Sequence, residues 1–204
     1  MSRIDKDWKL NFPAGTFGAH LFPEFAARAT AAAAEVFRVP EAADAAEVLI
    51  RIVGDGGARK AVVVESPLQE AADITQALRS RGVAVYTEPE EIAAHADTAD
   101  IGISGVEFGI AETGSVFQDG FAIETRLVTI LPPLHVVFLP SAHIVPGITE
   151  AFEVISRSFD RGYVGFITGP SRTADIERVL TIGVHGPSRF VIIAVDGEPG
   201  GGGA

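Results

Sequence analysis

Cysteine is absent from all 204 residues of the sequence. The chain therefore forms no disulfide, offers no thiolate to zinc and ligates no iron–sulfur cluster of the ordinary kind. No two histidines are spaced for one helix face and no carboxylate cluster repeats, so we predict no metal site and no bound cofactor. If the protein serves redox metabolism, we expect the electrons to pass to another protein or to a diffusible cofactor.

Long apolar runs and positive charge are also scarce. No apolar segment approaches the length of a membrane span, and the opening segment MSRIDKDWKL contains no apolar signal region. Lysine and arginine number 16 against 27 acidic residues, which gives a net charge of −11. We therefore expect a cytoplasmic protein that is attracted neither to an anionic membrane nor to nucleic acid. An anion that binds this chain needs a local basic site.

Hydrophobic residues make up 47% of the sequence, which is typical of a globular protein. We expect an N-terminal arm and helix over residues 1–33 that pack on a domain over residues 34–196. Aromatic residues in the arm support this packing. The glycine-rich segment 197–204 is predicted to be a disordered tail, because it has no side chains that pack.

Short apolar strands alternate with helices along the domain. Strands are predicted at 35–39, 61–64, 83–86, 101–104, 114–118, 135–139, 164–167 and 190–195. Helices are predicted at 24–33, 41–53, 68–81, 90–95, 124–130 and 148–159, with one or two helical turns at 105–111. This alternation is typical of βαβ units. We therefore predict an α/β fold of three layers, with a mostly parallel sheet and helices on both faces.

Residues 164–187, VGFITGPSRTADIERVLTIGVHGP, carry the first candidate site. A strand ends before Gly169, and apolar residues then recur at the spacing of a helix, at Ile176, Val179, Leu180, Gly183 and Val184. The N–H groups at the start of such a helix attract anions, and Arg172 adds a guanidinium. We predict an anion site beyond the carboxyl end of this strand, made by Gly169, Ser171, Arg172 and Thr173. The alternative is a structural turn in which the hydroxyls only cap the helix.

The second candidate site is the segment 111–115, AETGS. Glu112 is suited to act as a nucleophile, a general base or the partner of an arginine, with Gly114 and Ser115 beside it. His135 is a second candidate base, and Arg126 and His185 are candidate ligand contacts. Each has a structural alternative. Glu112 pairs with Arg126 or Arg172, His135 is a buried structural histidine, and His185 caps the C-terminus of the predicted helix.

Three segments resemble the lactate-utilization (LUD) domain family, in particular its lactate utilization protein C group. They are ADIGISGVEFGIAETGSV at 99–116, ILPPLHVVFLP at 130–140 and TGPSRTADIERVLTIGVHGP at 168–187. The resemblance spans about residues 34–196 and implies the fold of the NagB/RpiA/CoA-transferase superfamily. It also implies a role in the oxidation of L-lactate to pyruvate, as one of three proteins encoded together, with iron–sulfur subunits as partners.

Two functions of different classes follow. In the first, the chain is an accessory component that binds a small carboxylate or phosphate through Arg172, with Arg126 assisting and Glu112 and Ser115 orienting the ligand. If lactate is oxidised on this chain, His135 or Glu112 takes the hydroxyl proton. In the second, the chain is a stand-alone acyl-CoA transferase or sugar-phosphate isomerase that uses Glu112. CoA-transferases carry a catalytic glutamate before Asn-Gly, whereas Glu112 precedes Thr-Gly, so this match is partial.

Overall fold

The computed structural model describes residues 15–158, 162–174 and 180–197. Its central sheet has six strands, in the order β1 (Glu35–Val39), β12 (Arg189–Val195), β7 (Leu134–Pro140), β4 (Ile101–Gly105), β2 (Lys60–Val63) and β3 (Ala84–Tyr86). All neighbouring strands in it run parallel. The strands are rich in buried Val and Ile, because both faces of a parallel sheet are covered. The predicted mostly parallel sheet is confirmed.

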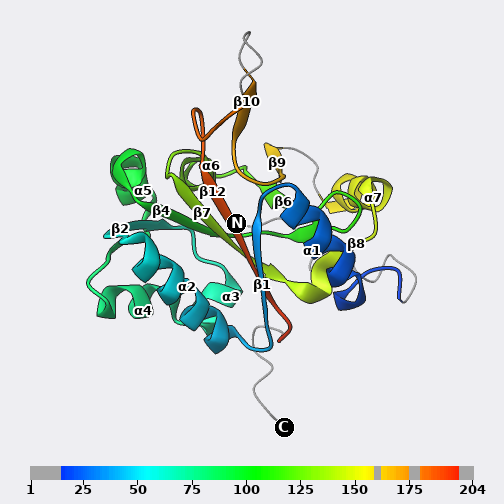
Figure 1. Cartoon of the computed structure of the whole chain (residues 1–204), viewed down its shortest axis with the longest axis horizontal. Coiled ribbons are helices and arrows are strands. Elements are labelled where there is room, and N and C mark those ends of the chain that lie inside the picture. The colour runs from blue at the N-terminus through cyan, green and yellow to red at the C-terminus, as the bar shows by residue number, and fades with distance from the viewer. Residues whose placement is uncertain (1–14, 159–161, 175–179, 198–204) are drawn as a thin grey trace.

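Helices cover both faces of this sheet, so the predicted three layers are confirmed. One face carries α2 (Ala42–Gly56), α3 (Pro67–Ala71) and α4 (Ile74–Ser80), and the other carries α1 (Phe22–Ala31), α5 (Pro89–His95) and α6 (Ile123–Ile130) (Figure 1). The alternation of side chains along each strand supplies both cores. On β7, Val136 packs with the α2 side and Val137 with the α1 side. Short 3-10 helices lie at Ala19–Leu21, Ala96–Thr98 and Ser141–His143.

A second, smaller sheet packs beside α1, and the sequence did not predict it. Its order is β8 (Ile144–Val145), β5 (Phe108–Ile110), β6 (Ser115–Asp119) and β9 (Val164–Ile167), and α7 (Ile148–Ser158) lies next to it (Figure 1). The rings of Phe108 and Phe117 stack across β5 and β6, with centroids 4.6 Å apart. The prediction of helical turns at 105–111 is therefore wrong. The apolar side chains of β5 are all buried, which suits a strand with both faces covered.

The helix predicted after Gly169 is also wrong where the structure describes it. Instead, β10 (Arg172–Ala174) pairs antiparallel with β11 (Leu180–Ile182), and the two strands stand out above the central sheet in Figure 1. Two residues of the supposed core stripe, Ile176 and Val179, lie outside the described residues. Val184, a third, is 52% exposed, so no core receives the stripe at this described residue. Helical spacing without a surface to pack against gives a helix little stability.

The single helix predicted at 68–81 is broken in two. Asp73, between α3 and α4, has a φ of 49°, in the left-handed region that only a few residue types tolerate. The remaining predicted helices and strands are present, with ends that differ by up to three residues. No helix in the described part of the chain is long and apolar enough to cross a bilayer.

Candidate functional site

Gly114, Ser115 and Gly169 lie together at the end of α1. Both glycines have positive φ, 68° and 69°, and both touch the backbone of the helix. A Cβ on Gly114 would lie 2.1 Å from the Ala29 nitrogen, and one on Gly169 would lie 2.0 Å from the Ala32 oxygen, so neither position accepts a side chain. Ser115 Oγ lies 2.6 Å from Thr168 Oγ1. The structure thus joins parts of both predicted sites through two hydroxyls.

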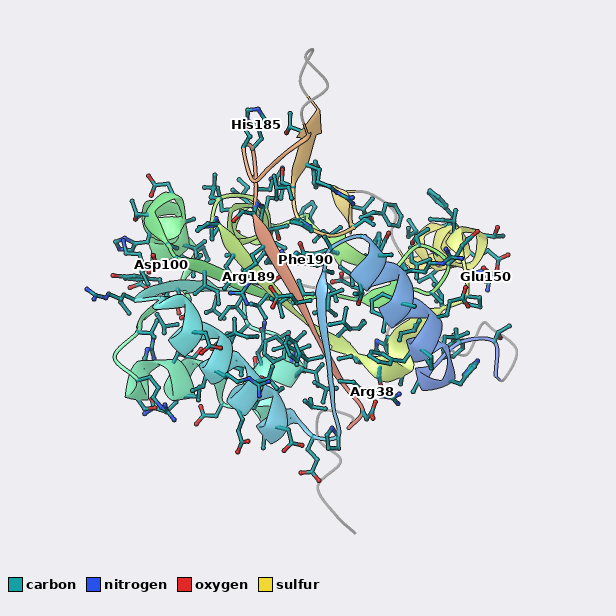
Figure 2. All side chains as sticks on the ribbon, in the orientation of Figure 1. Arg38, Asp100, Glu150, His185, Arg189 and Phe190 are labelled. Carbon is teal, nitrogen blue, oxygen red and sulfur yellow. The ribbon has the colours of Figure 1, made fainter. Side chains whose placement is uncertain are left out.

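Ser171 does not present a free amide to an anion. Its N–H donates to the Pro187 carbonyl at 2.8 Å, and its own carbonyl accepts from the Gly183 N–H at 2.9 Å. These bonds hold the hairpin base against the loop that carries His185, an exposed residue at the top of Figure 2. Pro187 precedes β12, so this loop lies at the amino end of the central sheet. Our placement of the loop beyond the carboxyl end of a strand of the parallel sheet is wrong, because β9 belongs to the second sheet.

Arg172 and Thr173 belong to β10, so they do not lie at the start of a helix as we expected. The Arg172 side chain is exposed, and its Nη2 lies 3.5 Å from the Thr168 carbonyl oxygen, at the limit for a hydrogen bond. Thr173 stands opposite Thr181 in the hairpin. The guanidinium therefore remains accessible to an anion. Thr168, whose hydroxyl pairs with that of Ser115, precedes Arg172 by four residues.

Glu112 caps α7 and is remote from the arginines with which we expected it to pair. Its Oε2 accepts a hydrogen bond from the Ile148 N–H at 3.1 Å, at the start of the helix. A carboxylate is favourable there, because the N-terminus carries the positive end of the helix dipole. Arg126 instead lies over the ring of Tyr163, with 5.2 Å from its guanidinium carbon to the ring centroid. Among the described residues, Glu112 makes no salt bridge to either Arg126 or Arg172.

His135 is fully buried within a polar network between β4, β6 and β7. Gln118 fixes the direction of the network, because its Nε2 donates to the Gly105 carbonyl at 3.0 Å and to Ser104 Oγ at 2.8 Å. Ser104 Oγ lies 2.9 Å from His135 Nε2, and the Thr129 hydroxyl lies 2.7 Å from Gln118 Oε1. Burial lowers the pKa of His135 to about 3, so the ring is neutral at physiological pH. This geometry favours the structural alternative for His135.

Sequence reasoning missed a cluster at the carboxyl ends of β1, β12 and β7. Asp196 follows β12 and accepts hydrogen bonds from Arg38 Nε at 2.9 Å and from Ser141 Oγ at 2.5 Å. Burial raises the pKa of Asp196, but the hydrogen bonds from Ser141 and Arg38 outweigh it and hold the pKa below its usual value. All three side chains thus have partners. A lone arginine in a strand and an aspartate 158 residues later gave no local signal in the sequence.

The neighbouring strands β2 and β4 form the point at which the strand order reverses. From β2 the chain passes through α3 and α4 to the edge strand β3, and from β4 it passes through the second sheet and α6 to β7 on the opposite side. Ligands of open α/β sheets bind beyond the carboxyl ends of the strands at such a reversal. Ser66 and Gly105 meet here: a Cβ on Gly105 would lie 2.7 Å from Ser66 Cβ.

Three of the five buried side-chain polar atoms without a partner in the described part of the chain lie at this reversal, and the other two are Arg126 Nε and His135 Nδ1. Ser66 Oγ and both amide atoms of Gln69, which is 2% exposed, have no hydrogen-bond partner among the described residues. Each such buried group costs about 1–3 kcal/mol of stability. Ser66 is the N-cap of α3 and Gln69 its third residue, the positions of a capping box, yet neither side chain caps the helix. The Ser-x-x-Gln pattern was the one available signal, and it favoured a simple cap.

Glu107 follows β4 and keeps its proton at neutral pH. Burial, together with the charge of Asp119, raises the pKa of Glu107 to about 8, although the Asp119 N–H donates to Glu107 Oε2 at 2.8 Å and lowers the pKa. The carboxyl group is turned toward β6. It is thus a neutral acid just beyond β4, and its backbone carbonyl lies 3.1 Å from His143 Nδ1.

Large apolar side chains are exposed around β9 and α7. Phe121 and Phe152 are 63% and 55% exposed, and Tyr163 and Phe166 are exposed beside them. The rings of Phe152 and Phe166 contact each other, with centroids 5.9 Å apart. Clustered exposed aromatics of this kind mark protein contacts more often than single apolar residues do.

Comparison with known proteins gives consistent relatives. The sequence model of the LUD domain matches residues 22–195. Lactate utilization protein C 1 of Bacillus mycoides is 38% identical over 118 residues, which are 54% of this chain and 50% of that protein. Lactate utilization protein C of Halalkalibacterium halodurans is 31% identical over 157 residues, which are 74% of this chain and 68% of that protein.

One solved structure has the same fold. It is a crystal structure of a DUF162 family protein from Deinococcus radiodurans, with a TM-score of 0.61 and 22% identity. The match covers 87% of this chain and 97% of that one. At this identity the likeness concerns the fold alone.

Proposed function

Because the chain belongs to the LUD domain family, as its resemblance predicted, we propose that it is a component of an L-lactate utilization system, in which L-lactate is oxidised to pyruvate. The observation that carries the proposal is the similarity to proteins named lactate utilization protein C, over 74% of this chain in one case. The matched segment spans only half of the first relative, so the activity of the whole relative is part of the proposal. We place the system in the cytoplasm.

Growth on lactate tests this role. In a lactate-utilising bacterium that lacks its own LUD-domain component, expression of this chain is expected to restore growth on L-lactate, but to leave growth on glucose unchanged. A folded, expressed protein that restores no growth would contradict the role.

The ligand contact that we propose for this role is a small carboxylate or phosphate at Arg172. The guanidinium is exposed, and the hydroxyls of Ser115 and Thr168 lie in the neighbouring turn. With the Ser171 amide already bonded, the loop offers fewer donors than a helix N-terminus would, and Arg172 carries most of the attraction. Arg172→Ala is expected to weaken binding by about 1.5–3 kcal/mol, the range for hydrogen bonds to charged groups. Titration calorimetry measures the change in affinity. The control is Arg81→Ala, at an exposed arginine that follows α4.

We also propose that iron–sulfur subunits work with this chain. A chain without cysteine needs partners to hold clusters of the ordinary kind, and the aromatics around β9 and α7 offer a surface for them. Co-purification from a lactate-grown host is expected to recover iron with the tagged protein. A Phe152→Ser, Phe166→Ser double variant is expected to lose that iron, with Phe121 left intact. Equal iron recovery by the variant contradicts this surface.

The alternative, a stand-alone acyl-CoA transferase or isomerase, depends on Glu112. Its carboxylate accepts a hydrogen bond from the start of α7, but the residue is exposed, so this contact does not by itself exclude the function. Incubation with acyl-CoA followed by borohydride separates the two functions. A modified Glu112 favours the transferase, and an unmodified one favours the lactate component.

A further inference from the structure

The carboxyl edge at β2 and β4 is covered by α3, a helix of one to two turns. It begins at Ser66-Pro67 and ends beside Asp73, whose backbone is in the strained left-handed region. It packs on α2 and on β7, and its N-cap Ser66 lies against Gly105 at the end of β4, so it begins at the place where open α/β sheets bind ligands.

The packing of α3 against the domain buries polar groups that have no hydrogen-bond partner among the described residues. Leu68 is buried beneath it, which favours the closed position. Ser66 Oγ and the Gln69 amide are buried with it and find no partner in the described chain. Residues three apart on a helix are neighbours, so these polar groups lie together on one side of α3. If α3 moved outward, hydrogen bonds from these groups to water or to a ligand would offset part of the cost of exposing Leu68.

We propose that α3 is a lid over a binding site for a 2-hydroxycarboxylate, which the Ser66 hydroxyl and the Gln69 amide bind when the lid admits it. The inference rests on the proposed function for the identity of the ligand, and it adds a site distinct from Arg172. The two sites lie at opposite ends of the central sheet, with the Arg172 hairpin at the amino end and Ser66 at the carboxyl end of β2, so they bind anions independently.

The chemistry of the three atoms defines this ligand. Gln69 Nε2 and Ser66 Oγ donate hydrogen bonds, which the two oxygens of a carboxylate accept. Gln69 Oε1 only accepts, and it needs a donor from the ligand. A hydroxyl on the carbon next to the carboxylate supplies that donor, whereas the carbonyl of a 2-oxo acid leaves the amide oxygen without one. A site built to bond a hydroxyl discriminates against the analogue that lacks it.

Stability and hydrogen exchange test the lid without any ligand. Gln69→Met keeps the shape of the side chain and removes the buried amide, so we expect Tm to rise by roughly 2–6 °C and the exchange of the Glu70 and Ala72 amides to slow at least about fivefold. Gln76→Met, an exposed position on α4, is the matched control and is expected to change neither. A lower Tm for Gln69→Met means that ordered water or an internal partner satisfies Gln69, and it overturns the lid.

Titration of the full chain tests the ligand. L-Lactate is expected to bind about tenfold or more tightly than pyruvate, and propionate, which also lacks the hydroxyl, is expected to bind as weakly as pyruvate. Gln69→Met is expected to abolish this preference, whereas Arg172→Ala, at the opposite end of the sheet, is expected to leave the preference unchanged.

The failures of the two proposals are distinguishable. If the chain restores growth on lactate but Gln69→Met keeps the full preference for lactate, the site under α3 is wrong and the lactate role stands. Equal binding of lactate and pyruvate by the unsubstituted chain likewise overturns the hydroxyl-selecting site. If growth is not restored while Gln69→Met removes a measured preference, the site stands and the proposed role fails.

Discussion

The carboxyl edge of the central sheet has two halves that treat polar groups in opposite ways. At β1, β12 and β7, Asp196 keeps its charge and bonds to both Arg38 and Ser141. At β2 and β4, Glu107 keeps its proton, and the polar atoms of Ser66 and Gln69 have no partner in the described structure. The same edge of one sheet thus contains a saturated half and an unsaturated half. Most buried polar groups of folded proteins have a partner, so the groups at β2 and β4 require an explanation.

The largest expected difference between the halves concerns pH. Between pH 4.5 and 8, folded Glu107 holds a proton that the unfolded chain releases, so stability falls as pH rises through this window. The loss is at most roughly 1.4 kcal/mol per pH unit. Glu107→Gln is expected to abolish it, and urea unfolding at a series of pH values measures it. Curves of Glu107→Gln that parallel the wild type would show that Glu107 is ionised; the exposed Glu90→Gln is the control.

A matched pair of serines gives the next effect. Ser141→Ala removes a buried hydroxyl that donates to the charged Asp196, and it is expected to cost about 1.5–3 kcal/mol. Ser66→Ala removes a hydroxyl without a partner, and it is expected to be neutral or to stabilise by up to about 1 kcal/mol. Chemical denaturation of both variants measures the contrast. Equal losses at the two sites would remove the distinction between the halves.

The smallest effect is expected at the amino edge of the sheet. Arg189 bonds to Glu35 with both Nε and Nη2, at 2.6 and 2.9 Å, but the two side chains are 41% and 39% exposed. Solvent screens such a pair, and Arg189→Met is expected to cost less than about 1 kcal/mol. Added salt should diminish that cost further. A loss as large as that of Ser141→Ala would mean that pairing at any edge stabilises this sheet equally.

Local pattern predicted the central sheet well, because each strand carries its own signal. The run Glu35–Val39 was placed with its observed ends, and the alternation with helices fixed the parallel arrangement. The hairpin at β10 and β11 was missed because the helical spacing of apolar residues does not show whether other side chains pack against those residues. Val184 is exposed in the structure, so the spacing had no energetic consequence.

The candidate site was harder to predict than the fold. Gly114 and Gly169 were chosen as ligand contacts for their flexible turns, but the structure uses them for contact with α1. Gln69 was overlooked because Ser-x-x-Gln is an ordinary helix start. Its burial depends on how α3 packs on α2 and β7, and that is a property of the assembled fold rather than of a short segment.

The position of α1 between two glycine turns has a consequence for engineering this chain. Ser115 and Thr168 are 53 residues apart in the sequence, but the glycine turns beside them both contact the backbone at the C-terminal end of α1. A larger side chain at Ala29 or Ala32, or deletion of the first 31 residues, would therefore move both turns at once, although the sequence of the turns themselves is unchanged. Truncated or tagged versions of the protein retain the Arg172 loop geometry only if this helix stays in place.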